Sequence, residues 1–196
     1  AAEQLPGTMR RMRAEKLVEK AEAEAKTNNW TQVLLFSDRA LQEQPNHARA
    51  AELRKKADGI ETVRYARERY QRLLQEAPGE LTALGLSVPD KEALMPILAQ
   101  YGAEAWGRVQ HAVTKAEENE TQGNAEASLS FWQQAIREFP IVVRDIRVGY
   151  WVARAEKSIQ EKAWAKASIE AQKALQADPH HARAQALLAE ADKNAK

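Results

Sequence analysis

Four histidines are the side chains of this sequence best suited to proton transfer or metal binding. They are His47, His111, His180 and His181. Three of them, His47, His180 and His181, follow a proline in similar turns, so a repeated structural turn explains them more simply than a metal site does. A zinc site would need further ligands that converge on the same turn. We therefore expect neither a metal centre nor a cofactor.

The sequence also gives little support for nucleophilic or acid–base catalysis. No cysteine is present, which excludes a thiol nucleophile, a disulfide and a cysteine-based zinc site. The HExxH, GxSxG, phosphate-loop and calcium-loop motifs do not occur either. Carboxylates cluster at Glu117, Glu118 and Glu120, but in a helix this rich in charge they are typical of a solvated face. The sequence thus predicts that the protein is not an enzyme.

Residues 49–72 form a basic stretch, with eight basic and four acidic side chains and with Tyr65 and Tyr70 among them. Basic side chains interleaved with aromatic rings can bind single-stranded nucleic acid. The simpler interpretation is an amphipathic helix with a solvated basic face and with Tyr70 in the core. Because the formal net charge of the chain is only +1, we favour this interpretation and expect no nucleic-acid partner.

The elements that carry these side chains must be helices, to judge from the composition. Hydrophobic residues make up 44% and charged residues 29% of the 196 positions, which argues against disorder and for a soluble folded protein. Strong helix formers such as alanine, glutamate, lysine and leucine recur throughout. No apolar run approaches the roughly 18 to 20 residues that span a bilayer. We expect no membrane span, and cytoplasm and periplasm are both compatible compartments.

Three segments of the chain repeat one another. Each contains a turn, then a helix with an Ala–Leu or Ala–Ile pair, and then a proline. The first two also share a tryptophan and a closing His-Ala-Arg-Ala. The segments are NNWTQVLLFSDRALQEQPNHARA (28–50), EKAWAKASIEAQKALQADPHHARA (161–184) and QGNAEASLSFWQQAIREFP (122–140).

The shared residues fit a role in helix packing. Small side chains at Ala40, Ala135 and Ala174 allow neighbouring helices to approach closely. The tryptophans fill the gap between the two helices of a pair. A proline removes a backbone donor and clashes with the preceding turn, so each helix is expected to end near its proline. These prolines are Pro45, Pro140 and Pro179.

This pattern resembles the tetratricopeptide repeat family, in which roughly 34 residues form two antiparallel helices. The resemblance implies an all-α fold in which helix pairs stack as a solenoid. One pair would lie near the N-terminus and two near the C-terminus, followed by a capping helix over residues 181–196. Arrays of this family bind proteins in a concave groove lined by the first helix of each pair.

The first helix of each pair therefore supplies the candidate binding residues. One subgroup of the family uses Lys, Asn and Arg on these faces to clamp a C-terminal carboxylate, and that clamp is absent here. Valine, isoleucine and glutamate predict instead a groove for an apolar helix or extended segment that carries some positive charge. The candidates are Val18, Glu22, Ala25, Val113, Glu117, Glu120, Val152, Glu156 and Ile159.

The segment after the first repeat does not keep the period. Residues 48–76 are predicted to be helical, with Gly59 in their midst. Either one long helix runs through Gly59, or two helices turn at Asp58 and Gly59. We favour the long helix, because no second turn residue flanks the glycine.

Prolines and glycines predict where the next elements begin and end. Pro78 and Gly79 are expected to end the long helix, and residues 80–88 to form a loop or a short helical turn. A capping box over residues 87–90 predicts a further helix to Tyr101. That helix contains Pro96, so it is expected to kink or begin late, and Gly102 is its expected stop.

The sequence divides into three regions on these grounds. Residues 1–58 hold the N-terminal pair and the helix after it, 59–107 a helical insertion, and 108–196 two pairs and the capping helix. The function we predict is a non-catalytic scaffold or adaptor that binds a segment of another protein in the groove. The alternative is a structural protein that assembles with copies of itself into oligomers.

Overall fold

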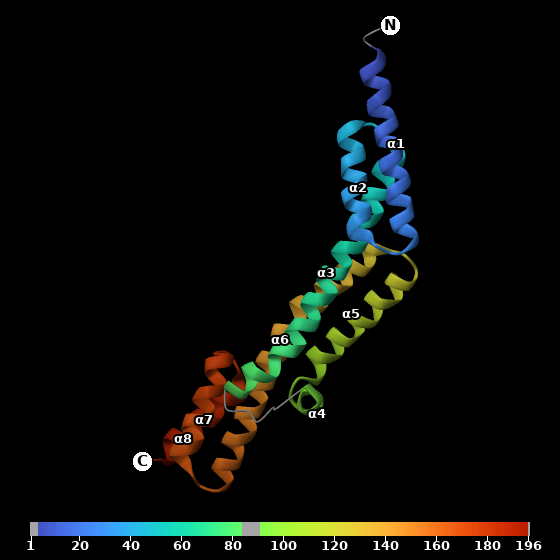
Figure 1. Ribbon diagram of the computed structural model, residues 1–196. Helices are drawn as coiled ribbons and strands as arrows, with labels where there is room; N and C mark the ends of the chain where they lie inside the picture. The colour runs from blue at the N-terminus through green and yellow to red at the C-terminus, as the bar shows by residue number, and fades with distance from the viewer. Residues whose placement is uncertain (1–3, 84–90, 196) are drawn as a thin grey trace. The chain divides into compact units, whose positions relative to one another are not determined.

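The structure is a computed structural model, and over the residues that it describes, 4–83 and 91–195, it contains helices and no strands (Figure 1). The predicted all-α class is confirmed. The helices are α1 (Gln4–Lys26), α2 (Trp30–Glu43), α3 (Ala48–Ala83), α4 (Lys91–Tyr101), α5 (Ala103–Thr121), α6 (Ala125–Gln160), α7 (Trp164–Ala177) and α8 (Ala182–Asn194).

These helices form two compact units. The N-terminal unit comprises residues 1–67 and 119–129, and the C-terminal unit comprises residues 68–118 and 130–196. Helices α3, α5 and α6 therefore each contribute residues to both units. Residues 58 and 59, where the sequence analysis divides the chain, lie inside α3.

The three repeated segments form turns of the same geometry. Each turn has one residue in the left-handed region, with φ of 58° at Asn28, 72° at Gly123 and 57° at Lys162. The next residue donates its N–H to the carbonyl five positions earlier, at 3.1, 2.9 and 2.8 Å respectively. These turns connect α1 to α2, α5 to α6 and α6 to α7, so the sequence repeat corresponds to a repeated helix–turn–helix.

Pro45 and Pro179 act as the sequence predicted. Helix α2 ends at Glu43 and α7 at Ala177, and the residue after each is extended, with φ of −140° and −141°. Since proline lacks the N–H that would continue the helix, the chain leaves in the extended direction.

A histidine caps the start of the helix that follows each of these turns. The His47 Nδ1 atom accepts the N–H of Ala50 at 3.3 Å, and the His181 Nδ1 atom accepts the N–H of Ala184 at 3.2 Å. Each imidazole thus satisfies a backbone donor at a helix start that would otherwise lack a partner.

Pro140 does not end a helix, so that prediction is wrong. Helix α6 runs through it from Ala125 to Gln160. An interior proline destabilises a helix by about 3 kcal/mol. Phe139, Val142 and Ile146 beside it are at most 2% exposed, and their burial together contributes about 5 kcal/mol. Tertiary packing therefore overrides the local signal.

The predicted end of the long helix at Pro78 and Gly79 is wrong for the same reason. Helix α3 continues to Ala83, so residues 80–83 belong to the long helix and are not a separate loop or turn after it. Residues 84–88 of that prediction lie outside the described residues. Ala77 is 1% and Leu81 0% exposed, so the segment on both sides of the proline is held in the core. The helix also passes through Gly59 without a break, which confirms the interpretation as one long helix.

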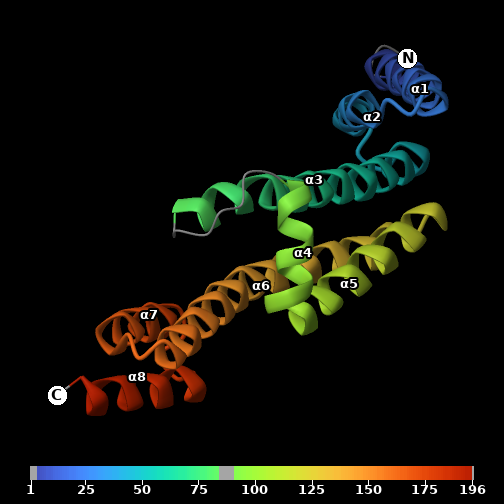
Figure 2. The ribbon, with the colours of Figure 1, turned by 90° about the horizontal axis from the view of Figure 1, so that it is seen from below.

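Helix α4 lies across α6 in the C-terminal unit (Figure 2). It contains Pro96 and ends at Tyr101, directly before Gly102, as expected. A Cβ atom on Gly102 would lie 3.4 Å from Val142 Cγ1, so the glycine lies directly against α6. The predicted capping box over residues 87–90 lies outside the described residues.

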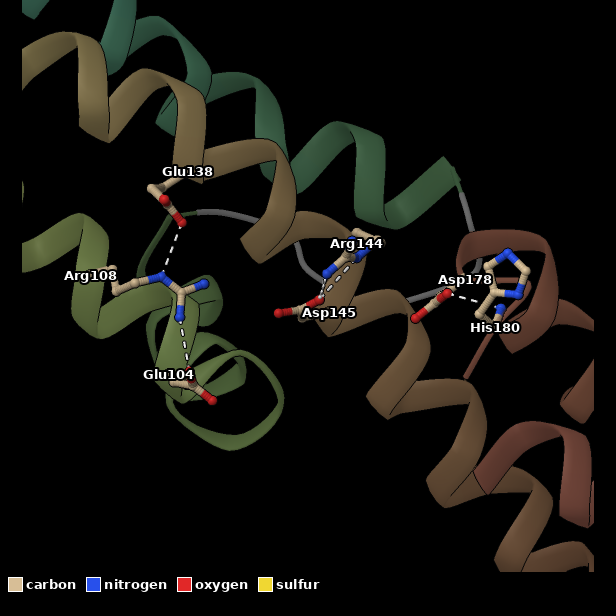
Figure 3. Close-up of polar contacts among 7 residues, drawn as sticks. All are labelled: Glu104, Arg108, Glu138, Arg144, Asp145, Asp178 and His180. Atoms are coloured by element: carbon tan, nitrogen blue, oxygen red, sulfur yellow. Dashed lines mark hydrogen bonds and ion pairs between the residues drawn. The ribbon is translucent and has the colours of Figure 1, made fainter. Parts of the chain in front are cut away.

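Aromatic rings and ion pairs join α3 and α5 to α6 within the C-terminal unit. The Tyr70 ring centroid lies 5.6 Å from that of Trp132 and 6.1 Å from that of Phe139. Arg108 of α5 donates to Glu138 of α6 at 3.1 Å and to Glu104 at 3.0 Å (Figure 3). The hydrogen bond to Glu138 raises the pKa of the Arg108 guanidinium above its ordinary value.

Two helical glycines of the C-terminal unit are expected to respond in opposite ways to alanine. A Cβ atom at Gly149 would lie 2.9 Å from Tyr101 Cδ1, whereas one at Gly107 would have no neighbour within 4 Å. Gly107→Ala should therefore raise the free energy of unfolding by about 0.5–1 kcal/mol, the usual gain in helix propensity. Gly149→Ala should lower it, because the Tyr101 ring must move. Chemical denaturation followed by circular dichroism measures the free energy of unfolding of both variants. An equal gain in the two would contradict the close contact between position 149 and Tyr101.

Candidate functional site

The candidate site is built around Trp30, the first residue of α2. Asn28 in the preceding turn is left-handed, with φ of 58°, and Trp30 begins α2 two residues later. The ammonium group of Lys56 on α3 lies 5.3 Å from the centroid of the Trp30 ring, a cation–π distance. Because Trp30 is only half-buried, part of its indole remains accessible to a ligand.

One face of α3 forms the floor beside Trp30. Glu52, Lys56, Ile60, Val63 and Arg67 follow one another at spacings of three or four residues and therefore lie along one side of the helix. Val63 is 6% exposed and Ile60 is half-buried, whereas the charged members are exposed. The face thus has an apolar centre between charged ends.

The turn between α5 and α6 closes the site on its other side, with Glu120, Gly123 and Ala125. A Cβ atom on Gly59 would lie 3.2 Å from the Cβ of Ala125. Glycine at position 59 therefore allows α3 to approach the start of α6 closely, which explains a residue that weakens the isolated helix.

Two hollows meet at these residues. The larger has a volume of 670 Å³ and is lined by the residues named above together with Asn28, Lys55 and Arg64. The smaller, of 390 Å³, lies between α1 and α3 and shares Trp30, Glu52 and Lys56 with the larger. All lining residues belong to the N-terminal unit. We call the two hollows together the N-terminal groove.

Ion pairs neutralise much of the charge at the edges of the groove. Arg49 donates to Glu22 and to Glu52, each at 2.8 Å. These hydrogen bonds, the one to Glu22 foremost, raise the pKa of the Arg49 guanidinium above its ordinary value. Arg67 lies 3.4 Å from Glu120 on the opposite side. The glutamates at the edges therefore already have cationic partners.

Three of the sequence-predicted candidates line this groove. Glu22 and Ala25 line the smaller hollow, and Glu120 lines the larger. Val18, from the same helix as Glu22, is 5% exposed and packs in the core of the N-terminal unit. The groove thus includes the end of α1, as expected, but most of its surface comes from α3.

The other candidates belong to the C-terminal unit. Val113 is half-buried on α5, and Glu117 is exposed near Tyr70. Val152 and Ile159 pack against a core of Ala155, Ala171 and Leu187. Glu156 accepts a hydrogen bond from Arg183 at 2.8 Å. The candidate residues from the three pairs are therefore divided between the two units.

Comparisons give this chain no relatives. No protein-family model, no curated protein and no solved structure matches it. Its function is therefore inferred from the residues and their geometry alone. Among the described helices none is long and apolar enough to cross a membrane.

The four histidines lie outside the N-terminal groove, and the side chains of two of them cap helices. His47 and His181 cap helices, and the backbone N–H of His180 donates to the Asp178 carboxylate at 3.1 Å (Figure 3). His111 is exposed on α5. Across residues 4–83 and 91–195, no three His, Asp or Glu side chains gather as metal ligands.

Sequence reasoning missed most of the groove. It assigned Trp30 to packing within a helix pair and the basic residues of α3 to a solvated face. The sequence contained one sign of the groove, which is that charged residues (Glu52, Lys56) and apolar residues (Ile60, Val63) share one side of the helix. The second signal was Gly59, since a glycine inside a long helix often marks a close approach by another segment.

Proposed function

We propose that this chain is a non-catalytic protein-binding module of tetratricopeptide-like helix pairs, which holds an apolar segment of a partner protein in the N-terminal groove. The observation that carries the proposal is a pair of adjoining hollows, with apolar residues on the floor and charged residues at the edges, formed within one compact unit. Such a surface gives a helix or extended peptide both apolar anchors and polar positioning. The repeated turn geometry supports the tetratricopeptide-like assignment and the stacking of pairs.

Ile60 offers a test of this function, because it lies on the groove floor and is only half-buried. Peptides selected from a displayed random library against the whole chain should lose affinity at least about tenfold for Ile60→Ser, since the apolar anchor is removed. Calorimetric titration of the selected peptides measures the loss. Circular dichroism checks that the variant is folded.

Leu35→Ser is the matched control for this test. Leu35 is an apolar residue of the same unit, 40% exposed on α2, and does not line the groove. The control should bind the selected peptides as the native chain does. A library that yields no peptide, or peptides that Ile60→Ser and Leu35→Ser affect equally, would reject the proposal.

A further inference from the structure

Three lysines at the edge of the N-terminal groove give it an excess of positive charge. Lys55 and Lys56 line the larger hollow, and Lys26 and Lys56 line the smaller. None of the three forms an ion pair with another residue whose side chain the structure describes. No carboxylate of the groove therefore cancels their charges, although the Lys56 ammonium also lies over the Trp30 ring.

The arginines and glutamates of the groove largely cancel one another. Arg49 is held by Glu22 and Glu52, and Arg67 lies against Glu120. Arg64 lies 2.6 Å from Glu61, whose side chain is nearly buried and also accepts a hydrogen bond from Thr31 at 3.0 Å. The net charge that a ligand meets thus comes from the lysines.

We propose that the N-terminal groove selects an acidic segment of another protein, with apolar side chains on the floor at Trp30 and Ile60 and carboxylates beside Lys26, Lys55 and Lys56. This inference rests on the proposed function and specifies its ligand. It reverses the positive partner expected from the sequence, because Glu22 and Glu120, the two glutamates of that expectation that line this groove, already have arginine partners. Charge complementarity of this kind governs the choice of partner and the association rate.

A peptide fits the groove better than a single-stranded nucleic acid does. Base stacking needs an open aromatic face, whereas Lys56 lies over the Trp30 ring. A phosphate backbone carries a negative charge at every nucleotide, whereas the uncancelled positive charge of the groove comes from Lys26, Lys55 and Lys56. A short acidic segment needs only a few carboxylates placed at these lysines, so it matches that charge.

The test uses the peptides selected from a displayed random library on the whole chain, and it reverses the charge of two lysines. We expect the selected peptides to carry net negative charge and to bind at least about tenfold more weakly to Lys55→Glu/Lys56→Glu. Raising the salt concentration well above the physiological value should also weaken the binding of these peptides to the native chain. Lys16→Glu is the control, because Lys16 is exposed on α1 outside the groove.

The outcomes separate this inference from the proposed function. The selected peptides could be neutral or basic, with binding that Ile60→Ser abolishes and Lys55→Glu/Lys56→Glu leaves unchanged. This result would overturn the acidic ligand but keep the groove as a binding site. Failure to select any peptide would overturn both. A single-stranded oligothymidylate that competes with the peptides, and whose own binding is lost on charge reversal, would overturn the choice of a protein segment.

Discussion

Glu170→Ala is expected to lower the free energy of unfolding by about 2–4 kcal/mol. Glu170 of α7 is only 3% exposed and is held by two donors from α6. Ser158 Oγ donates to it at 2.6 Å and Arg154 Nε at 2.9 Å. Alanine leaves a buried hydroxyl without its acceptor and opens a cavity between the two helices. Chemical denaturation followed by circular dichroism measures the loss.

Two further substitutions separate this polar contact from a general effect of charge. Glu161→Ala removes a carboxylate that is about half exposed, with a side chain 51% accessible, and should change stability by less than about 1 kcal/mol. Glu170→Gln keeps an acceptor for Ser158 and should destabilise less than Glu170→Ala. Equal losses for Glu170→Ala and Glu161→Ala would contradict the role assigned to the buried carboxylate.

The same position of the repeat is filled differently in the N-terminal unit. Phe36 of α2 corresponds to Glu170 of α7, and Lys20 corresponds to Arg154. The Lys20 ammonium lies 5.7 Å from the Phe36 ring, where the C-terminal unit has an ion pair. One helix–turn–helix geometry thus accepts either a cation–π contact or a buried carboxylate. The residues at these two corresponding pairs of positions differ in chemistry, although the turns between their helices share one geometry.

The local parts of the fold could be predicted from the sequence. The ends of α2 and α7 follow from Pro45 and Pro179, because the effect of a proline depends on neighbours within one turn. The continuity of α3 and α6 through prolines could not be predicted. It depends on burial of Leu81, Phe139 and Ile146 against segments distant in the chain, which a local pattern does not contain.

The N-terminal groove could be predicted from the sequence even less well than the long helices. Its floor combines Trp30, Ile60 and Ala125, which come from three helices. The family resemblance directed attention to the first helix of each pair and so identified Glu22, Ala25 and Glu120. It predicted from the glutamates a partner that carries some positive charge. The pairing of Glu22 with Arg49 becomes visible only when α1 and α3 are placed side by side.

Tyr70 is expected to make the protein lose stability at high pH. Burial foremost, and then the nearby charge of Glu117, raise the pKa of the Tyr70 hydroxyl from 10.0 to about 12. An unfolded chain ionises this group near pH 10.0, so the native state binds its proton more tightly. The resulting stabilisation is fully present below pH 10.0 and is lost as the pH rises to about 12. Its magnitude is about 2–3 kcal/mol.

Phenylalanine substitutions isolate this effect from the other ionisations at high pH. Tyr70→Phe keeps the ring contacts with Trp132 and Phe139 but removes the ionisable hydroxyl, so its stability should fall less between pH 10.0 and about 12. Tyr65→Phe, at a position 60% exposed on the same helix, should follow the native profile. Urea denaturation at a series of pH values gives the three curves. If Tyr70→Phe loses stability as steeply as the native chain, the buried hydroxyl is not the cause of the alkaline loss.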